Sequence, residues 1–313
     1  MRQIWKTAKI MLALLLFLTA VREQGKAREH WDIVTVFLEG DGAEVSQVRE
    51  ICSREAKQEE AAALCFWEEQ EQATVSCQST GQSAGVSLLT VLGNGDLAVP
   101  GTASLAWRQK GCFLDRATAE ELFGTAKADG QMLWRGQESY TVRGTFDSMK
   151  RIMAVSGEEG QTKAFRAVSL RFSDNRNGRA KAEQFLMRHG LSGEIIDFVF
   201  LNAFVQNLLL LFPAAVAVRL TGLLLRGYGK AGLLLAVIAA AMTIFLICRC
   251  VEIPADMIPT QWSDFSFWSG WWTGQKQNIL RILETPLGEA QLSMLFQMGR
   301  SVFCSVAAVL LIL

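Results

Sequence analysis

Four apolar segments dominate the pattern of hydrophobic and polar residues along the chain. One occupies residues 1–21, and the other three lie at 195–218, 232–248 and 294–313. A helix needs about 17 to 25 mainly apolar residues to cross a bilayer. The pattern therefore predicts a membrane protein with four transmembrane helices.

The first apolar segment has a second interpretation. Its core, Ile10–Val21, is short and follows basic residues at positions 2, 6 and 9. A cleaved secretory signal peptide has the same layout, and Leu18-Thr19-Ala20 fits a cleavage site. Extension back through Ile4 and Trp5 gives instead a retained helix of spanning length. Both interpretations start the chain in the cytoplasm.

The distribution of charge predicts which side of the membrane each connection occupies. The connection 219–231 carries three basic residues and no acidic residue, namely Arg219, Arg226 and Lys230. Lys and Arg in a short connection mark the cytoplasmic side. We therefore expect 219–231 to be a cytoplasmic loop, and 22–194 and 249–293 to be extracytoplasmic.

Within 22–194 the pattern predicts both strands and helices. Trp31–Leu38 is rich in β-branched and aromatic residues, which is typical of a strand. Val45, Val48 and Ile51 recur at helical spacing. Asn94-Gly95, between the apolar runs Val86–Leu92 and Leu97–Val99, predicts a hairpin because a type I′ turn needs positive φ at both central positions. Residues 22–194 should therefore form one α+β domain.

The stretch Gly111–Gly144 is the most informative part of this domain. Asp115 can cap a short helix that Gly124 ends in the left-handed conformation. The helix should turn Ala119, Leu122 and Phe123 toward a core. Two strands, 131–135 and 139–144, should follow as a second hairpin.

This order of elements resembles the MacB-like periplasmic core domain, in which a helix ending Ala-x-x-Leu-Phe-Gly precedes a glycine and a hairpin ending Val-x-Gly. The motif positions in this chain are Asp115, Ala119, Leu122, Phe123, Gly124, Gly130, Val142 and Gly144. The predicted topology is also similar to that of MacB/FtsX-type ABC transporter permeases. The resemblance implies a multi-pass protein of the bacterial plasma membrane, paired with itself or with a second permease, that transmits motion to its outer domain.

The resemblance also implies a cytoplasmic ABC ATPase as a separate subunit. No Gly-x-x-x-x-Gly-Lys-Ser/Thr motif is present on this chain. We expect 219–231 to be the segment that contacts the ATPase, through Arg219, Leu223, Leu224, Leu225, Arg226 and Lys230. Orientation by the positive-inside rule alone is the simpler explanation for its basic residues.

Composition excludes several other classes of function. The chain has 31 basic and 31 acidic residues, which argues against a basic nucleic-acid-binding protein. Its two histidines, His30 and His189, belong to no metal-binding or catalytic motif, so we expect no enzyme activity and no cofactor. Four of the seven cysteines, Cys52, Cys65, Cys77 and Cys112, lie in the outer domain. We predict at most one disulfide, with its pairing open.

Two alternatives remain open at this point. The tryptophans of 249–293, which are Trp262, Trp268, Trp271 and Trp272, fit either a membrane interface or a face that binds a sugar or a partner protein. The whole chain fits either a transporter subunit of undefined substrate and direction or an FtsX-like regulator of a cell-envelope enzyme. A membrane-anchored enzyme is the weakest reading, because the chain has no catalytic set of residues.

Overall fold

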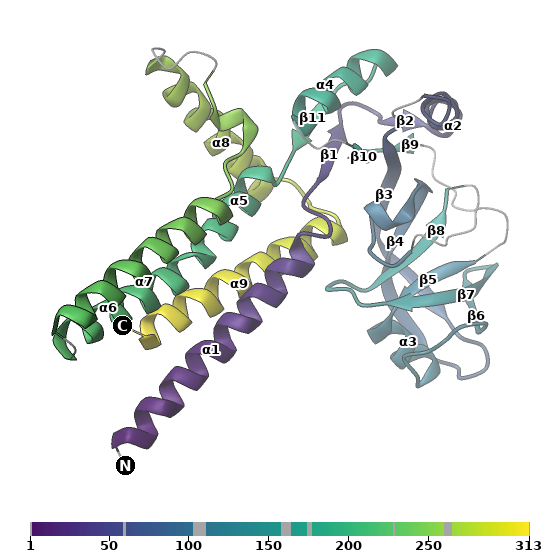
Figure 1. Ribbon diagram of the computed structural model, residues 1–313. Coiled ribbons are helices and arrows are strands. Elements are labelled where there is room, and N and C mark those ends of the chain that lie inside the picture. The colour runs from purple at the N-terminus through teal and green to yellow at the C-terminus, as the bar shows by residue number, and fades with distance from the viewer. Residues whose placement is uncertain are drawn as a thin grey trace. The chain divides into compact units, whose positions relative to one another are not determined.

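A computed structural model describes residues 2–58, 61–102, 111–157, 164–173, 177–227, 229–259 and 265–312. The chain forms two compact units (Figure 1). A helical unit comprises Met1–Trp31, Phe198–Trp272 and Met294–Leu313. An α+β unit comprises Asp32–Asp197 and Thr273–Ser293. Residues Thr273–Ser293 follow the third apolar segment in the sequence. They nevertheless belong to the same unit as the domain that precedes the second apolar segment.

The α+β unit is built on a nine-stranded sheet in the described residues, with the order β11-β1-β10-β3-β4-β8-β5-β7-β6. An additional pairing of β3 with β6, Ser76 opposite Trp134, joins the strands from β3 to β6 into a closed ring. The strands are β1 (Ile33–Leu38), β3 (Ala63–Ser76), β4 (Ser83–Gly93), β5 (Cys112–Asp115), β6 (Met132–Arg135), β7 (Glu138–Phe146), β8 (Ile152–Ser156), β10 (Ala167–Arg171) and β11 (Gly193–Ile196). Two short strands, β2 (Ala43–Glu44) and β9 (Ala164–Phe165), pair separately.

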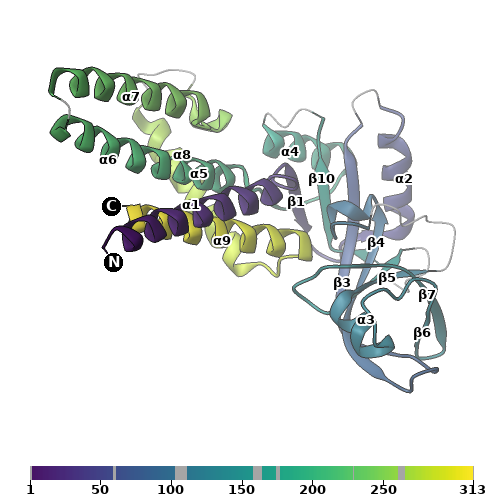
Figure 2. The same cartoon turned by 60° about the horizontal axis from the view of Figure 1, so that its bottom comes forward.

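Three helices cover this sheet. Helices α2 (Val45–Glu55) and α4 (Gly178–His189) bury Val48, Ile51 and Phe185 in one core with residues of β1, β3 and β10. Helix α3 (Arg116–Phe123) lies beside β4, β5 and β7 of the closed ring (Figure 2). The helical spacing of apolar residues therefore predicted α2 and α3 correctly, and the three helices on the sheet confirm the α+β class of the domain.

The predicted hairpin at Asn94-Gly95 is wrong. Gly95–Leu97 form a 3₁₀ turn, η1, in which the Asn94 Oδ1 accepts from the Asp96 amide at 3.3 Å. Leu97, Ala98 and Val99 do not extend the sheet but are buried in a core with Trp67. Strand β4 instead pairs with β3 and, in parallel, with β8. The Asn-Gly pair predicts a turn from two neighbouring residues alone. The burial of three consecutive apolar residues depends on the sheet against which they pack, and the sequence pattern does not show it.

The helical unit contains α1 (Arg2–Ala27), α5 (Val199–Leu209), α6 (Leu211–Gly227), α7 (Gly229–Cys250), part of α8 (Phe265–Glu284) and most of α9 (Glu289–Ile312). Among the described residues, three helical stretches are long and apolar enough to cross a membrane, namely Val199–Leu225, Ala231–Cys250 and Glu289–Ile312. Helix α1 is not one of these three. It packs on α6, where the rings of Phe17 and Phe212 stack at 4.3 Å. A span at residues 1–21 therefore stays a prediction.

Several boundaries differ from those predicted. Ile195 and Ile196 belong to β11, so the second apolar helix begins at Val199. It is interrupted at Leu210, because Pro213 has no amide to donate to the carbonyl of Leu209 and its ring crowds that carbonyl. The stretch 249–293, predicted as a loop, contains α8 and the first turn of α9.

The stretch 219–231 is also not the loop that we expected. Helix α6 runs to Gly227 and α7 begins at Gly229, so all described residues of this stretch are helical. Leucine, alanine and arginine are good helix formers, and they extend each helix up to the flanking glycines. A single position, which lies outside the described residues, separates the two helices in the sequence.

Candidate functional site

The first five residues of the family motif belong to α3 or cap its ends. Asp115 caps this helix by accepting from the Thr118 amide at 2.9 Å, and its other carboxylate oxygen accepts from the Ile152 amide of β8 at 2.9 Å. Ala119 and Leu122 are buried, Phe123 is partly buried, and Gly124 ends the helix with φ +70°. The predicted cap, core face and terminator are therefore confirmed as structural features.

The later motif positions shape the hairpin of β6 and β7. The Gly130 amide donates to the Val142 carbonyl at 2.8 Å, and the Val142 side chain is buried in the ring core. A Cβ at Gly144 would lie 2.8 Å from the Phe113 ring, so a larger residue would displace that ring. Each motif residue thus has a packing or turn role that does not require a ligand.

A different set of residues joins the last helix to this domain. The stretch Thr273–Ser293 belongs to the same compact unit as the sheet, and its Leu287, Gly288 and Ala290 are buried. The Ala290 amide donates to the Ala98 carbonyl, just after η1, at 3.2 Å. We call the residues that bind Leu287–Gln291 to the sheet the α9 docking site.

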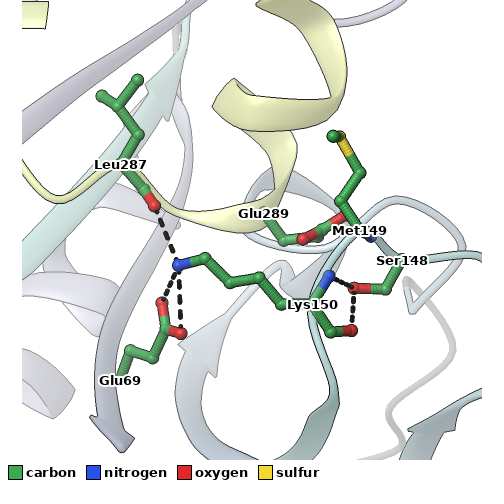
Figure 3. Close-up of polar contacts among 6 residues, drawn as sticks. All are labelled: Glu69, Ser148, Met149, Lys150, Leu287 and Glu289. Atoms are coloured by element: carbon green, nitrogen blue, oxygen red, sulfur yellow. Dashed lines mark hydrogen bonds and ion pairs between the residues drawn. The ribbon is translucent and has the colours of Figure 1, made fainter. Parts of the chain in front are cut away.

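Lys150 forms one side of the α9 docking site (Figure 3). Its Nζ lies 3.2 and 3.1 Å from the Glu69 carboxylate oxygens and 3.2 Å from the Leu287 carbonyl oxygen. Ser148 holds the lysine backbone in place, because its hydroxyl accepts from the Lys150 amide at 3.0 Å and donates to the Lys150 carbonyl at 2.6 Å. One ammonium group thus links β3 to the chain just before α9.

Glu289, the first residue of α9, binds the same turn. Its carboxylate accepts from the Met149 amide at 2.7 Å, and the residue is buried (Figure 3). A carboxylate in the first turn of a helix also interacts favourably with the helix dipole. The turn Ser148–Lys150 therefore holds both the chain before α9 and the helix itself.

A chain of buried side-chain hydrogen bonds forms the centre of the α9 docking site. Gln291 donates through Nε2 to the Thr35 Oγ1 at 2.6 Å. The hydroxyls of Thr35 and Ser169 lie 3.2 Å apart, and the Trp67 Nε1 donates to the Ser169 Oγ at 3.0 Å. These residues come from α9, β1, β10 and β3, so the chain of bonds crosses three neighbouring strands.

Gly288 allows the close approach of these elements. A Cβ on Gly288 would lie 2.8 Å from the Gln291 Oε1 and 2.9 Å from the Trp67 Cη2. Its carbonyl also accepts the first helical bond of α9, from the Leu292 amide at 3.1 Å. A side chain at this position would therefore push the start of α9 away from β3.

Further along, α9 is bound to α1 within the helical unit. The Ser301 hydroxyl donates to the Ala20 carbonyl at 2.9 Å, and Arg300 lies 3.6 Å from the Glu23 carboxylate. The next residue of α1, Gln24, donates to the buried Asn202 Oδ1 of α5 at 2.8 Å. Asn202, a polar residue of the second apolar segment, thus bonds a neighbouring helix.

The residues predicted to contact an ATPase lie at the end of α6 and the start of α7. Leu223 and Leu225 are 60% and 51% exposed, and Leu224 is partly buried. Arg219 lies two turns before the end of α6. The side chains of Arg226 and Lys230, like Trp262 of the tryptophan-rich stretch, lie outside the described part of the chain.

Among the described residues, no group of three or more His, Cys, Asp and Glu side chains could hold a metal ion. The His189 side chain is buried with its Nε2 2.8 Å from the Glu55 carboxylate, so it joins α4 to α2. Cys52, Cys65, Cys77 and Cys112, all within the described part of the chain, form no disulfide in the structure.

The α9 docking site was not predicted from the sequence. Only two neighbouring polar residues, Glu289 and Gln291, mark this site in the sequence. They lie just before an apolar segment, where polar residues are also expected at the end of a membrane span. Their partners are separated from them by more than a hundred residues of chain, as the 140 positions between Met149 and Glu289 illustrate. No local pattern pairs residues over such distances.

Comparisons with known proteins give a structural match for the domain. No protein-family model and no curated protein matches the chain. The crystal structure of the periplasmic region of MacB from Actinobacillus actinomycetemcomitans is similar with a TM-score of 0.43 and 12% identity, over 54% of this chain and 89% of that one. The crystal structure of the extracellular domain of the noncanonic ABC-type transporter YknZ from Gram-positive bacteria is similar with a TM-score of 0.39 and 12% identity, over 52% of this chain and 97% of that one. Over about half of its length, the protein matches in structure the MacB periplasmic region and the YknZ extracellular domain.

Proposed function

We propose that the protein is a permease-like subunit of an ABC transporter in the bacterial plasma membrane. In this proposal a separate cytoplasmic ATPase hydrolyses ATP, and this chain converts the resulting motion into movement of its extracytoplasmic domain. The motif resemblance of residues 115–144, the candidate membrane helices and the lack of a P-loop motif in the sequence support this assignment.

The observation that carries the proposal is the α9 docking site. Helix α9 begins with residues bonded to β1 and to the turn before β8, and it continues as a candidate membrane span. A buried hydrogen bond that is broken without replacement costs about 1–3 kcal/mol. A displacement of α9 along its axis would break several such bonds at once, so the domain should move with the helix.

The bonds from Ser301 to Ala20 and from Arg300 to Glu23 extend this coupling to α1. Helix α1 leads directly into β1, the strand that Gln291 binds. Helices α1 and α9 therefore both connect to the same strand. This arrangement favours transmission of motion over a substrate path through the membrane, since Gln24 of α1 and Asn202 of α5 bind each other through Nε2 and Oδ1.

The input to this mechanism would be the end of α6 and the start of α7. Each helix is a rigid element, so a displacement of its end would be passed along its length. Leu223 and Leu225 present exposed apolar side chains there, as a helix that inserts into a groove of a partner requires. This is the surface that we assign to the ATPase subunit.

The test is co-purification of the full chain from its own membranes, followed by mass spectrometry. We expect an ABC ATPase in the purified complex, and we expect its loss in the variant Leu223→Asp/Leu225→Asp. Met132→Asp, an exposed apolar position on β6, is the matched control and should retain the ATPase. An isolated chain, or a complex that survives the double substitution, would contradict the proposal. An additional cell-wall hydrolase or sensor kinase in the complex would indicate a regulatory rather than a transporting subunit.

A further inference from the structure

The first two turns of α8 lie against the start of a candidate membrane span. The rings of Trp271 and Phe200 meet edge to face, with centroids 5.4 Å apart at 80°. Phe200 is the second residue of the span Val199–Leu225. The Trp271 Nε1 also donates to the Asp256 carboxylate at 3.2 Å. Trp271 therefore holds the amino-terminal part of α8 against the first residues of that span.

The two neighbouring tryptophans have no comparable cover. Trp268 is 38% exposed and Trp272 is 57% exposed. Because they are four residues apart, they lie on one face of the helix. Ile253 and Ile258, in the stretch between α7 and α8, are also exposed in the helical unit. Exposed large apolar side chains on one face, such as Trp268 and Trp272, mark an interaction surface.

The chemistry of this surface fits the boundary between lipid and water. Indole rings concentrate at membrane interfaces, because the ring is apolar and its N–H group needs a polar partner. Residues 265–272 have the sequence Phe-Ser-Phe-Trp-Ser-Gly-Trp-Trp and carry no charge. A protein-binding or sugar-binding face would not need to lie level with the end of a membrane span, whereas an interfacial face must.

We propose that Phe265–Trp272 lie in the outer interface of the lipid bilayer, with Trp268 and Trp272 inserted as anchors. The partner is the lipid surface itself, so this inference does not depend on an ATPase subunit. Further along the same helix, Asn278 donates to the Asp197 carbonyl at 2.9 Å, directly after β11. The anchored helix thus also holds the edge of the extracytoplasmic domain.

Quenching of tryptophan fluorescence tests this proposal in the full chain. The protein is reconstituted into phosphatidylcholine vesicles with and without acyl chains brominated near the headgroup, and iodide is added to both faces in parallel samples. The emission that Trp268 and Trp272 contribute is the difference between the wild type and Trp268→Phe/Trp272→Phe. Trp134→Phe, on β6 of the domain, provides the matched control.

We expect brominated lipid to quench most of the emission that Trp268 and Trp272 contribute. Iodide should quench little of this emission. The difference emission of the control should show no quenching by lipid. Quenching by iodide alone would overturn the proposal in favour of an aqueous binding face. Emission that neither agent quenches would overturn it in favour of a protein interface. Circular dichroism of each variant checks folding, and the single variant Trp272→Phe replaces the double variant if that fails to fold.

Discussion

Gln291, in the first turn of α9, donates a hydrogen bond to the Thr35 hydroxyl of β1 across 2.6 Å, and both residues are buried. The Thr35 hydroxyl also lies 3.2 Å from that of Ser169, which binds Trp67. A buried polar group that loses its partner is costly, so this chain of bonds favours a single position of the helix on the sheet. Helix α9 is therefore joined to the domain in a defined register.

Replacement of Gln291 by Leu should weaken this joint. The substitution keeps a similar volume but removes the donor, so we expect a loss of about 1–3 kcal/mol in the free energy of local unfolding. Hydrogen exchange should show faster exchange of the amides of β1 and of the first turn of α9. Gln277→Leu, at an exposed position of α8, is the control and should leave these amides unchanged. Equal hydrogen-exchange protection of these amides in Gln291→Leu and Gln277→Leu would mean that the bond from Gln291 to Thr35 does not stabilise the position of α9 on the sheet.

Lys150 makes two separable contributions to the α9 docking site. Lys150→Met removes both the ion pair with Glu69 and the bond to the Leu287 carbonyl, and should lower the free energy of unfolding by about 1–2 kcal/mol. The exchanged pair Glu69→Lys/Lys150→Glu restores the ion pair but places a carboxylate beside that carbonyl. We expect only partial recovery in denaturant titrations. Full recovery would show that the Leu287 contact is unimportant.

Two glycines provide a comparison between a crowded and an open position. Gly288→Ala should displace the start of α9, because the new Cβ would meet Trp67 at 2.9 Å. Gly299→Ala, within the same helix, meets no atom within 4 Å and should stabilise the helix by up to about 1 kcal/mol. Thermal unfolding in detergent distinguishes the two. The explanation fails if both substitutions change the melting temperature in the same direction.

Cys52 should react slowly with alkylating reagents. Burial raises the pKa of its thiol from 9.0 to about 11, and a backbone hydrogen bond opposes only part of this effect. At pH 8 its thiolate should be about a hundredfold rarer than that of an ordinary cysteine, because each pKa unit is a factor of ten. Since the folded pKa is the higher one, this group's contribution to stability is present below pH 9 and is lost as the pH rises toward 11.

Mass spectrometry after brief exposure to iodoacetamide checks this prediction. Cys52 should remain unmodified at pH 8 in the folded protein and become modified in denaturant or near pH 11. Modification at pH 8 at the rate seen in denaturant would contradict the burial of this thiol.

The parts of the fold that the sequence predicts are those set by neighbouring residues. Asp115 and Thr118 lie within one helical turn, and Gly124 ends the same helix with a positive φ that glycine adopts easily. The spacing of Val48 and Ile51 identifies α2 for the same reason. Such signals need no knowledge of the tertiary structure.

The parts that escaped prediction depend on distant residues. Strand β8 pairs in parallel with β4 and antiparallel with β5, and neither partner adjoins it in sequence. Leu97–Val99 are apolar enough for a strand but are buried against Trp67 instead. The α9 docking site depends entirely on such contacts, since Gln291 and Thr35 are 256 positions apart. Burial and long-range pairing decide these features, and a single sequence does not encode them as a local pattern.

Hydrogen exchange of the purified complex with its co-purifying ATPase, with and without a non-hydrolysable ATP analogue, tests the central claim most directly. If motion passes from the ATPase to the domain, nucleotide should change the exchange of the connection between α6 and α7 and also that of β1 and Leu287–Gln291. The response of β1 should be lost in Gln291→Leu/Lys150→Met while the response of the α6–α7 connection is retained. Unchanged exchange of β1 and Leu287–Gln291 on nucleotide binding to the unmodified complex would contradict the account.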